Sequence, residues 1–575
     1  MILLSSLLLN ILYVAKMKQA KKSPPLVRRY IGELPIVRAC AERLGLRHII
    51  SRYLPSHGNE RIAAVDSLMI MVYNIACGRQ PVYELEHWAT RLGGRVLPGN
   101  GAGMNMLNDD RFGRVLDKLY MADRASLATE IAVETTRIEQ LEHTRVHNDS
   151  TTVKAYGRIA GTTRTGLCLA RGLSKDHRPD LKQLVYSLTI SADGAVPIHY
   201  KAYPGNRTDD TTHIETWTTL RRIVGRADFL YVADCKVCTD EQLHHIVGNG
   251  GRVVTVMPDT WKESDKFKDR LRRNKKSKRV LLRREIESHE GRYETFSCFN
   301  GKQITQRRGY RLFWIHSTEK RTRDRQAREA ALRKTEQLLA ELNGRLNKRN
   351  LKRRPPIHKR INEILSSHDT SRFFTVTIAT TASVRRVQRS RGRPGPATKY
   401  SLRTKRLLTL HWNRNDAALH QELNIDGIFP LLCTDRSLSA KEALLAYKYQ
   451  PRLEKRFSQF KSYLNAAPLL FKKIERVEAT MFLYFLALIL QAVIERKVRK
   501  MMKQDEIDAI PIYPENRPAP HPTTAKIFAL FEGISTYTVK RGSRGSECYR
   551  DELTSIQIKV LSLLGLKEKD YWPSG

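Results

Sequence analysis

The chain has 575 residues, of which 41% are hydrophobic, so it can form roughly two to four domains with buried cores. Its 101 Lys and Arg residues outnumber its 59 Asp and Glu residues and give a net charge of +42. A soluble chain this basic usually pairs with a polyanion, and nucleic acid is the first candidate. A membrane surface and ribosomal RNA remain alternatives. The eight cysteines form no regular framework, which excludes a disulfide-stapled fold and indicates a reducing compartment.

Two apolar runs bear on membrane contact. Met1 to Ala15 is hydrophobic but lacks a charged start, and Met17 opens a basic stretch. We therefore favour a misassigned start codon over a signal peptide or anchor. The second run, Met481 to Ile494, has 14 residues, which is too short for a bilayer span and predicts a buried helix. We expect no membrane partner.

Residues 28–140 are predicted to form a helical N-terminal domain, after an uncertain start at 1–27. Apolar residues recur at helical spacing, and glycine-rich stretches separate the helices. The predicted helices are Ile36–Leu44, Ala63–Ala76, Pro81–Trp88 and Arg111–Leu119. Whether this domain only folds or also binds DNA stays open.

From about residue 141 the pattern becomes that of an α/β core. Three strands, Val146–Val153, Leu184–Ile190 and Val196–Tyr203, predict an antiparallel meander. The next elements are a helix at Thr212–Val224, a strand at Phe229–Ala233, a helix at Glu241–Val247 and a strand at Arg252–Met257. This order is typical of a ribonuclease-H-like fold with a mixed sheet. Residues 141–258 and 426–500 are predicted to form this core.

Residues 259–425 interrupt the core as a basic insertion. The helical stretch Arg321–Asn347 carries leucines at heptad spacing, which favours a helical arm or hairpin over a coiled-coil dimer contact. Strand-like runs follow at Phe373–Ile378 and Leu407–His411. The loop between them contains Arg391-Gly-Arg393-Pro, which is similar to an AT-hook; a solvated basic loop is the alternative. Residues 501–575 are predicted to be a proline-containing linker and tail.

Three carboxylates are candidate metal ligands. Asp149 and Asp234 stand at the ends of predicted strands, and Glu454 lies on a predicted helix that also carries Tyr447 and Lys461 at seven-residue spacing. Phosphodiester chemistry needs an activated oxygen nucleophile, and two divalent ions held by carboxylates supply it. Taken singly, each acid is more often a cap, a turn former or a solvated residue. Asp426 and Asp435 are rivals for the third place.

The loop Gly172–Gln183 is dense in donors and acceptors. Beside Asp149 it would grip DNA phosphates through four side chains, Lys175, His177, Arg178 and Lys182. The alternative is an internally bonded turn. The segment Gly205-Asn-Arg-Thr-Asp209 is predicted to enter and cap a helix.

Taken together, the chain resembles DDE transposases of bacterial insertion sequences, in the group whose ribonuclease-H-like core is interrupted before the catalytic Glu. The likeness covers most of residues 28–500. It is carried by His147–Thr152, Gly172–Gln183, Gly205-Asn206, Val232–Asp234, Asp426–Pro430, Ile474–Ala479 and the Glu454 helix. The group's signature around the Glu has Tyr, Arg, Glu and Lys at fixed spacing, and here Gln450 stands in place of the Arg.

The resemblance implies that Asp149, Asp234 and Glu454 bind two ions of Mg²⁺ or Mn²⁺ and catalyse DNA cleavage and strand transfer. It implies double-stranded DNA partners, namely element ends and target, a homodimer on DNA, and a bacterial cytoplasmic protein at the nucleoid. A ribonuclease-H-like nuclease without transposition and an inactive DNA-binding protein remain alternatives. The predicted DNA contacts near the Glu are Tyr447, Gln450, Arg452 and Lys461.

Overall fold

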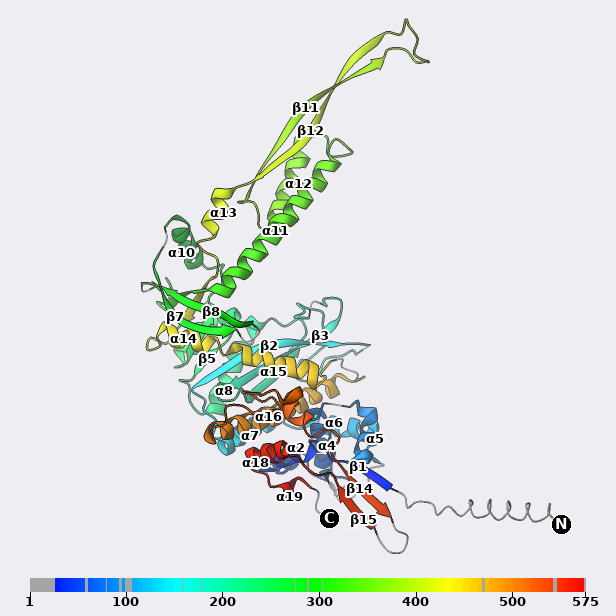
Figure 1. Cartoon of the computed structure of the whole chain (residues 1–575), viewed down its shortest axis with the longest axis vertical. Helices are drawn as coiled ribbons and strands as arrows, with labels where there is room; N and C mark the ends of the chain where they lie inside the picture. The colour runs from blue at the N-terminus through cyan, green and yellow to red at the C-terminus, as the bar shows by residue number, and fades with distance from the viewer. Residues whose placement is uncertain are drawn as a thin grey trace, which may run out of the picture. The chain divides into compact units, whose positions relative to one another are not determined.

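The computed structural model describes residues 26–572 apart from 57–59, 79, 93–95, 99–105, 158, 177, 275, 287–288, 302, 468–470 and 541–545. The expectations for Met1–Met17 and for His177 therefore lie outside the described residues. The chain forms two compact units, residues 1–253 with 446–575, and residues 254–445 (Figure 1). The five predicted segments are grouped into these two units.

Unit one contains the predicted α/β core. Its strand order is β4-β3-β2-β5-β6, with β2, β3 and β4 antiparallel and β5 parallel to β2. Helices α8 and α9 connect β4 to β5 and β5 to β6, so the order of elements is that of a ribonuclease-H-like sheet. The bounds are β2 Arg145–Ala155, β3 Lys182–Ser191, β4 Pro197–Pro204, α8 His213–Val224, β5 Leu230–Val232, α9 Asp240–Gly248 and β6 Arg252–Val256.

The N-terminal helices are α2 Leu34–Arg43, α3 Leu46–Tyr53, α4 Ala64–Ala76, α5 Leu85–Arg91, α6 Asp109–Met121 and α7 Arg124–Glu139. Of these, α2, α4, α6 and α7 pack against one long helix, α16 (Ile474–Gln504), and α3 packs on α2, α4 and α7. Their apolar faces, the inner face of β3 and the middle of α16 belong to one continuous hydrophobic core. The N-terminal segment is therefore part of the same packed body as the core sheet.

Helix α16 is longer than the 14-residue apolar run predicted. The 14-residue apolar run is the middle of a 31-residue helix, which by length and composition alone is long enough to cross a membrane. The helix extends because Glu, Lys and Arg on its last turns continue good helix formers past the apolar run. Within its most apolar window, 94% of the helix is buried inside the structure. The prediction of a buried helix is thus confirmed by packing and not by length.

The C-terminal residues also fold onto unit one. Strand β14 (Ser535–Lys540) pairs with β1 (Leu26–Tyr30) on one side and with β15 (Ser546–Arg550) on the other. Three short helices belong to the same part of the chain. Helix α17 (Thr524–Ala529) precedes β14, and α18 (Ser555–Leu564) and α19 (Glu568–Tyr571) follow β15. The Tyr571 hydroxyl donates to the Gly32 carbonyl at 2.6 Å, so the last described residues close over the first.

Unit two contains a sheet and a helical arm. From Val254 onward β6 pairs with β13, and the sheet continues through β10 and β8 to β7. Helix α11 packs antiparallel to α12 through the predicted leucine stripe, whose members Leu332, Leu339, Leu342 and Leu346 are buried. The stripe is covered within the chain, which confirms a helical hairpin. The bounds are α10 Lys262–Arg273, β7 Lys278–Ile286, β8 His289–Phe299, β9 Gln303–Ile304, β10 Arg311–Ser317, α11 Thr318–Arg345, α12 Arg354–Ser367, α13 Asp416–Glu422, β13 Ile428–Cys433 and α14 Ala440–Tyr447.

Two further strands, β11 (Phe374–Gln388) and β12 (Tyr400–Arg414), form a separate two-stranded ribbon. The sequence predicted strands only at residues 373–378 and 407–411. Both strands extend well beyond these bounds. They pair with each other along their full length, even where neither face of the ribbon is buried. Arg385 and Arg386, predicted to be in a loop, are strand residues.

Candidate active site

Asp149 and Asp234 occupy equivalent places on neighbouring strands. In the parallel pair of β2 and β5, His147 is opposite Val232, so two residues further along each strand lie Asp149 and Asp234. Asp234 lies two residues past the end of β5 and caps a short 3-10 turn by accepting from the Lys236 amide at 3.0 Å. Carboxyl ends of parallel strands are where ligands gather in such sheets. The two predicted carboxylates therefore meet at the functional edge of the sheet.

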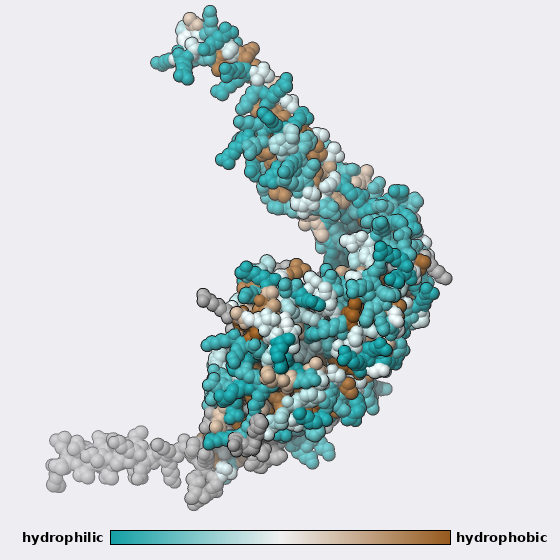
Figure 2. All heavy atoms as spheres, turned by 180° about the vertical axis from the view of Figure 1, so that it is seen from behind, coloured by the Kyte–Doolittle hydropathy of each residue, from teal (hydrophilic) through white to brown (hydrophobic). Residues whose placement is uncertain are grey.

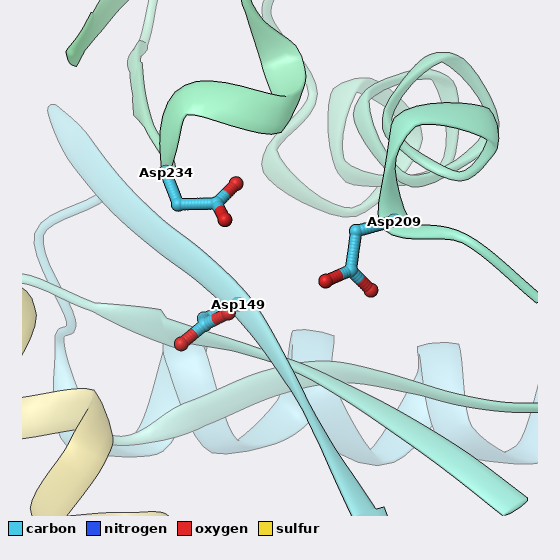
Figure 3. Close-up of side chains that lie close together, drawn as sticks. All are labelled: Asp149, Asp209 and Asp234. Atoms are coloured by element: carbon cyan, nitrogen blue, oxygen red, sulfur yellow. The ribbon is translucent and has the colours of Figure 1, made fainter. Parts of the chain in front are cut away.

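A third carboxylate, Asp209, lies beside them and was not among the predicted ligands. Oxygens of Asp149, Asp209 and Asp234 all lie within 4.8 Å of one another, and Figure 3 shows the three side chains converging. Asp209 begins the 3-10 turn Asp209–Thr211, yet its side chain caps nothing. It instead accepts a 2.5 Å hydrogen bond from the Ser150 hydroxyl on β2. The predicted capping role is wrong, because this tertiary contact uses the carboxylate.

Two glycines bring Asp209 to the strand. A Cβ on Gly205 would lie 2.0 Å from the Gln183 carbonyl oxygen, and one on Gly172 would lie 2.2 Å from the Gly205 carbonyl oxygen. No larger residue fits where these backbones cross. The Gln183 side chain seals the crossing by donating to the Gly205 carbonyl at 3.0 Å. The segment before Asp209 is thus held against the predicted loop at Gly172–Gln183.

Burial and mutual repulsion disfavour the charged forms of Asp149 and Asp234. Burial, and next the charge of Asp149, raise the pKa of Asp234 to about 6. Burial also raises the pKa of Asp149, against the lowering effect of Lys175. Three oxygen donors that repel each other and converge on one point suit a hard divalent cation such as Mg²⁺ or Mn²⁺. The residues present therefore fit a divalent metal ion.

Lys175 supplies a cation of the chain's own at this place. Its ammonium lies 3.2 Å from Asp149 Oδ1 and 3.4 Å from Asp209 Oδ2, and donates to the Ser150 carbonyl at 2.7 Å. Burial lowers the pKa of Lys175, but the charges of Asp149 and Asp209 outweigh burial, so the net pKa is raised. The side chain was predicted to grip DNA phosphates; here it faces carboxylates. The loop that carries it does lie beside Asp149, as predicted.

Replacing Lys175 with Met is expected to tighten Mn²⁺ binding about tenfold, or by about 1.4 kcal/mol. The ammonium offsets the carboxylate charge, so its removal leaves more negative charge for a divalent ion. The measurement is the rise in melting temperature on adding Mn²⁺. Lys182→Met, which removes an exposed charge at the start of β3, is the matched control. An equal Mn²⁺ response in Lys175→Met and the wild type would contradict this role.

The predicted helix around Glu454 is broken before the Glu. Helix α14 ends at Tyr447, and α15 (Gln450–Ser458) begins with Pro451 in its first turn, where proline is favoured. The prediction of one helix from Tyr447 to Lys461 is therefore wrong, since Pro451 starts a new helix and a π-helical turn at Gln459–Tyr463 follows it. Glu454 is exposed on α15 and is not part of the three-aspartate group.

Gln450 fixes α15 to the strand that carries Asp149. Its amide nitrogen donates to the Asn148 carbonyl at 2.9 Å, and its amide oxygen lies 3.1 Å from His147 Nδ1. Gln450 and Glu454 are four residues apart and share a face of the helix. The tether therefore turns the Glu454 face of α15 toward β2. The predicted DNA contact of Gln450 stays a prediction, and its buried amide already serves this internal role.

Tyr447 connects Glu454 with the aspartates electrostatically. Burial, followed by the charges of Asp234, Cys235, Asp149 and Glu454, raises the pKa of Tyr447 to about 12. The Tyr447 hydroxyl is thus influenced by the charges of all three predicted triad members.

The other predicted DNA contacts are scattered. Lys461 donates to Asp176 at 2.7 Å in the Gly172–Gln183 loop, and Arg178 pairs with Asp180 at the surface. Lys182 is exposed and Arg452 is half-buried. Arg391 and Arg393 are exposed in the turn between β11 and β12, in unit two. Their DNA contacts stay predictions.

The rival third carboxylates have structural partners in unit two. Asp426 is buried and accepts from Arg328 at 2.6 and 2.7 Å. Asp435 accepts from the amide and the hydroxyl of Ser437 at 2.8 and 2.6 Å. Asp426 is thus an ion-pair residue and Asp435 a turn residue, at the two ends of β13.

The chain is similar to a protein family of undescribed function and to solved structures. Residues 27–133 match a family described as a domain of unknown function, DUF4277. No curated protein matches the chain. Among solved structures, the cryo-EM structure of the piggyBac transposase synaptic complex with hairpin DNA aligns with a TM-score of 0.34 and 9% identity, over 80% of this chain and 76% of that chain. The family match covers the N-terminal helices up to part of α7 and contains none of the three aspartates.

Proposed function

We propose that this chain is a DDE transposase that cleaves DNA at the ends of an insertion sequence and joins the freed 3′-hydroxyl to target DNA. The observation that carries the proposal is the register of Asp149 and Asp234 on adjacent parallel strands of a sheet in ribonuclease-H-like order. The net charge of +42 agrees with a DNA partner. The N-terminal match is to a family found in transposases.

In this proposal Asp149 and Asp234 would hold one divalent ion, and Glu454 would help to hold a second. Two Mg²⁺ or Mn²⁺ ions would supply positive charge to the attacking and leaving oxygens of the phosphodiester. Asp209 would orient the neighbouring side chains of this site, because it accepts a hydrogen bond from the Ser150 hydroxyl and pairs with the Lys175 ammonium. Gln450 fixes the angle of α15 through its hydrogen bond to β2. The active form would be a homodimer on DNA in the bacterial cytoplasm, at the nucleoid.

Glu454 and Asp209 are expected to differ in the kind of defect their loss produces. Glu454→Gln removes a metal-binding carboxylate and is expected to lower cleavage of element-end DNA at least about a thousandfold at any Mg²⁺ concentration. Asp209→Asn loosens the support of the site and is expected to raise the Mg²⁺ needed for half-maximal cleavage about 10- to 100-fold.

Asp210→Asn is the control for Asp209→Asn, because Asp210 is the adjacent exposed residue outside the carboxylate group. If Glu454→Gln cleaved normally while Asp209→Asn could not be rescued by Mg²⁺, Asp209 would replace Glu454 as third ligand. Joined products with a labelled target separate the transposase from a nuclease, which would release only cleaved ends.

A further inference from the structure

The ribbon of β11 and β12 carries a strong, unneutralised positive charge. Between Asp369 and Asp416 the chain has eleven Lys and Arg residues and no Asp or Glu. Two of these stand near the base and are paired, Arg372 with Glu422 and Arg414 with Glu329 and Glu336. Among the described residues, the other nine have no carboxylate partner: Arg385, Arg386, Arg389, Arg391, Arg393, Lys399, Arg403, Lys405 and Arg406. The positive charge is therefore concentrated on the part of the ribbon beyond its base.

The strand register places like charges directly opposite one another. Arg385 pairs with Arg403 across the ribbon, and Lys405, two residues along, lies on the same face opposite Ser383. All three cations are exposed. Like charges at directly opposed positions destabilise a strand pair. A chain that keeps three cations together here, with no acid nearby, has a surface that an external anion would stabilise.

Only the base of the ribbon is covered. Phe374, Ile378 and Leu410 are buried against α11 and α12, whereas from Thr381 to Leu407 neither face has a partner within the described chain. On the face opposite the Arg385 cluster, Val384 is 58% and Leu402 is 68% exposed, beside Arg386 and Arg406. In Figure 2 the ribbon forms a mainly hydrophilic projection with isolated apolar patches. This distribution is unlike the interior of a protein interface, where charge is depleted.

We propose that the free part of the ribbon, residues 381–407, is an arm that binds duplex DNA, with Arg385, Arg403 and Lys405 on phosphates. A two-stranded ribbon, with strands about 4.8 Å apart, fits the roughly 12 Å wide major groove. The proposal rests on the transposase function and extends it, because the arm would hold DNA through residues of unit two that are not among the carboxylates.

The test is the salt dependence of binding by the full chain in EDTA, so that no cleavage occurs. The triple variant Arg385→Gln, Arg403→Gln, Lys405→Gln is measured by fluorescence anisotropy on a labelled random-sequence duplex. The slope of log affinity against log salt concentration is expected to fall by about 2.7, since each phosphate contact contributes about 0.9. The control variant Arg137→Gln, Arg226→Gln, Arg360→Gln removes the same charge from exposed arginines already paired with Glu134, Asp228 and Glu363. Its slope is expected to match the wild type.

A second variant separates binding from folding. Arg385→Glu places an acid opposite Arg403, so the ribbon itself is relieved of repulsion while a phosphate contact is lost. The melting temperature is expected to be no lower than that of the wild type, and DNA affinity at about 50 mM salt is expected to fall at least tenfold. An unchanged salt slope in the triple variant would overturn the proposal that the ribbon binds duplex DNA. Tighter binding to an RNA duplex than to a DNA duplex of the same sequence would overturn it as well.

The arm and the proposed chemistry fail independently. Asp149→Asn is expected to bind the duplex with the wild-type salt slope while losing cleavage. If Asp149→Asn kept full cleavage, the transposase proposal would fall and the arm would stand. If the triple ribbon variant bound DNA like the wild type while Asp149→Asn lost cleavage, the arm alone would fall.

Discussion

Replacing Asp149 or Asp234 with Asn is expected to lower Mg²⁺-dependent cleavage of element-end DNA by at least about a thousandfold. Carboxylate-bound ions contribute several kcal/mol to the stabilisation of charge in phosphodiester cleavage, and each 1.36 kcal/mol is about tenfold in rate. Asn keeps the size of the side chain and can still accept the Ser150 and Lys236 amide hydrogen bonds seen at these positions. The loss would therefore reflect missing charge and metal affinity, with the fold retained. Single-turnover cleavage of a labelled duplex measures it.

Asp228→Asn is the matched control for this loss. Asp228 lies just before β5, at the opposite end of the strand from Asp234, and pairs with Arg226 at the surface. Cleavage by this variant is expected to stay within about twofold of the wild type. Wild-type cleavage by both Asp149→Asn and Asp234→Asn would remove the basis of the transposase proposal.

The order of the core elements could be predicted because each carries its own local signal. Strands β2 to β6 and helices α8 and α9 begin and end within a few residues of the predicted bounds. Alternating or fully apolar β-branched runs identify strands without knowledge of their neighbours. The positions of Asp149 and Asp234 follow from that order, since Asp149 lies within the first core strand and Asp234 just past the end of the strand that pairs with it. This part of the site was therefore accessible from the sequence.

The position of Asp209 and the break before α15 were not predicted from the sequence. The place of Asp209 depends on two backbones crossing at Gly172 and Gly205, a contact between segments more than thirty residues apart. Nothing within the segment Gly205–Asp209 distinguishes a cap from a ligand. The break at Tyr449 did have a signal, because Pro451 fits the first turn of a helix and not its middle. The full length of the ribbon could not be predicted, because its free half lacks the buried face that marks a strand.

Arg456→Met is expected to destabilise unit one by about 3–5 kcal/mol, the usual cost of leaving one member of a buried ion pair without its partner. Arg456 and Glu495 have side chains only 5% and 6% exposed and meet at 2.9 Å. The guanidinium also donates to the Ala195 and Gly194 carbonyls at 3.0 and 3.2 Å, in the turn between β3 and β4. One side chain thus connects α15, α16 and the core sheet.

The double variant Arg456→Met, Glu495→Met tests whether the cost comes from the unpaired charge. Replacing a buried pair with apolar residues is often nearly neutral, so the double variant is expected to be more stable than the sum of the single changes predicts. Urea unfolding followed by tryptophan fluorescence gives the three free energies. Arg452→Met, one turn earlier on α15 and half-buried, is expected to stay within about 0.5 kcal/mol of the wild type.

The single variant Arg456→Met also tests whether α15 positions Glu454. Because Arg456 and Gln450 hold α15 at two points, loss of Arg456 lets the Glu454 face move relative to β2 even while the chain stays folded. Cleavage by Arg456→Met is therefore expected to fall more than tenfold at a temperature where the protein is fully folded, since small displacements of catalytic groups carry large rate costs. Normal cleavage by this destabilised variant would mean that α15 does not position a catalytic group, and the role of Glu454 would then fall to Asp209.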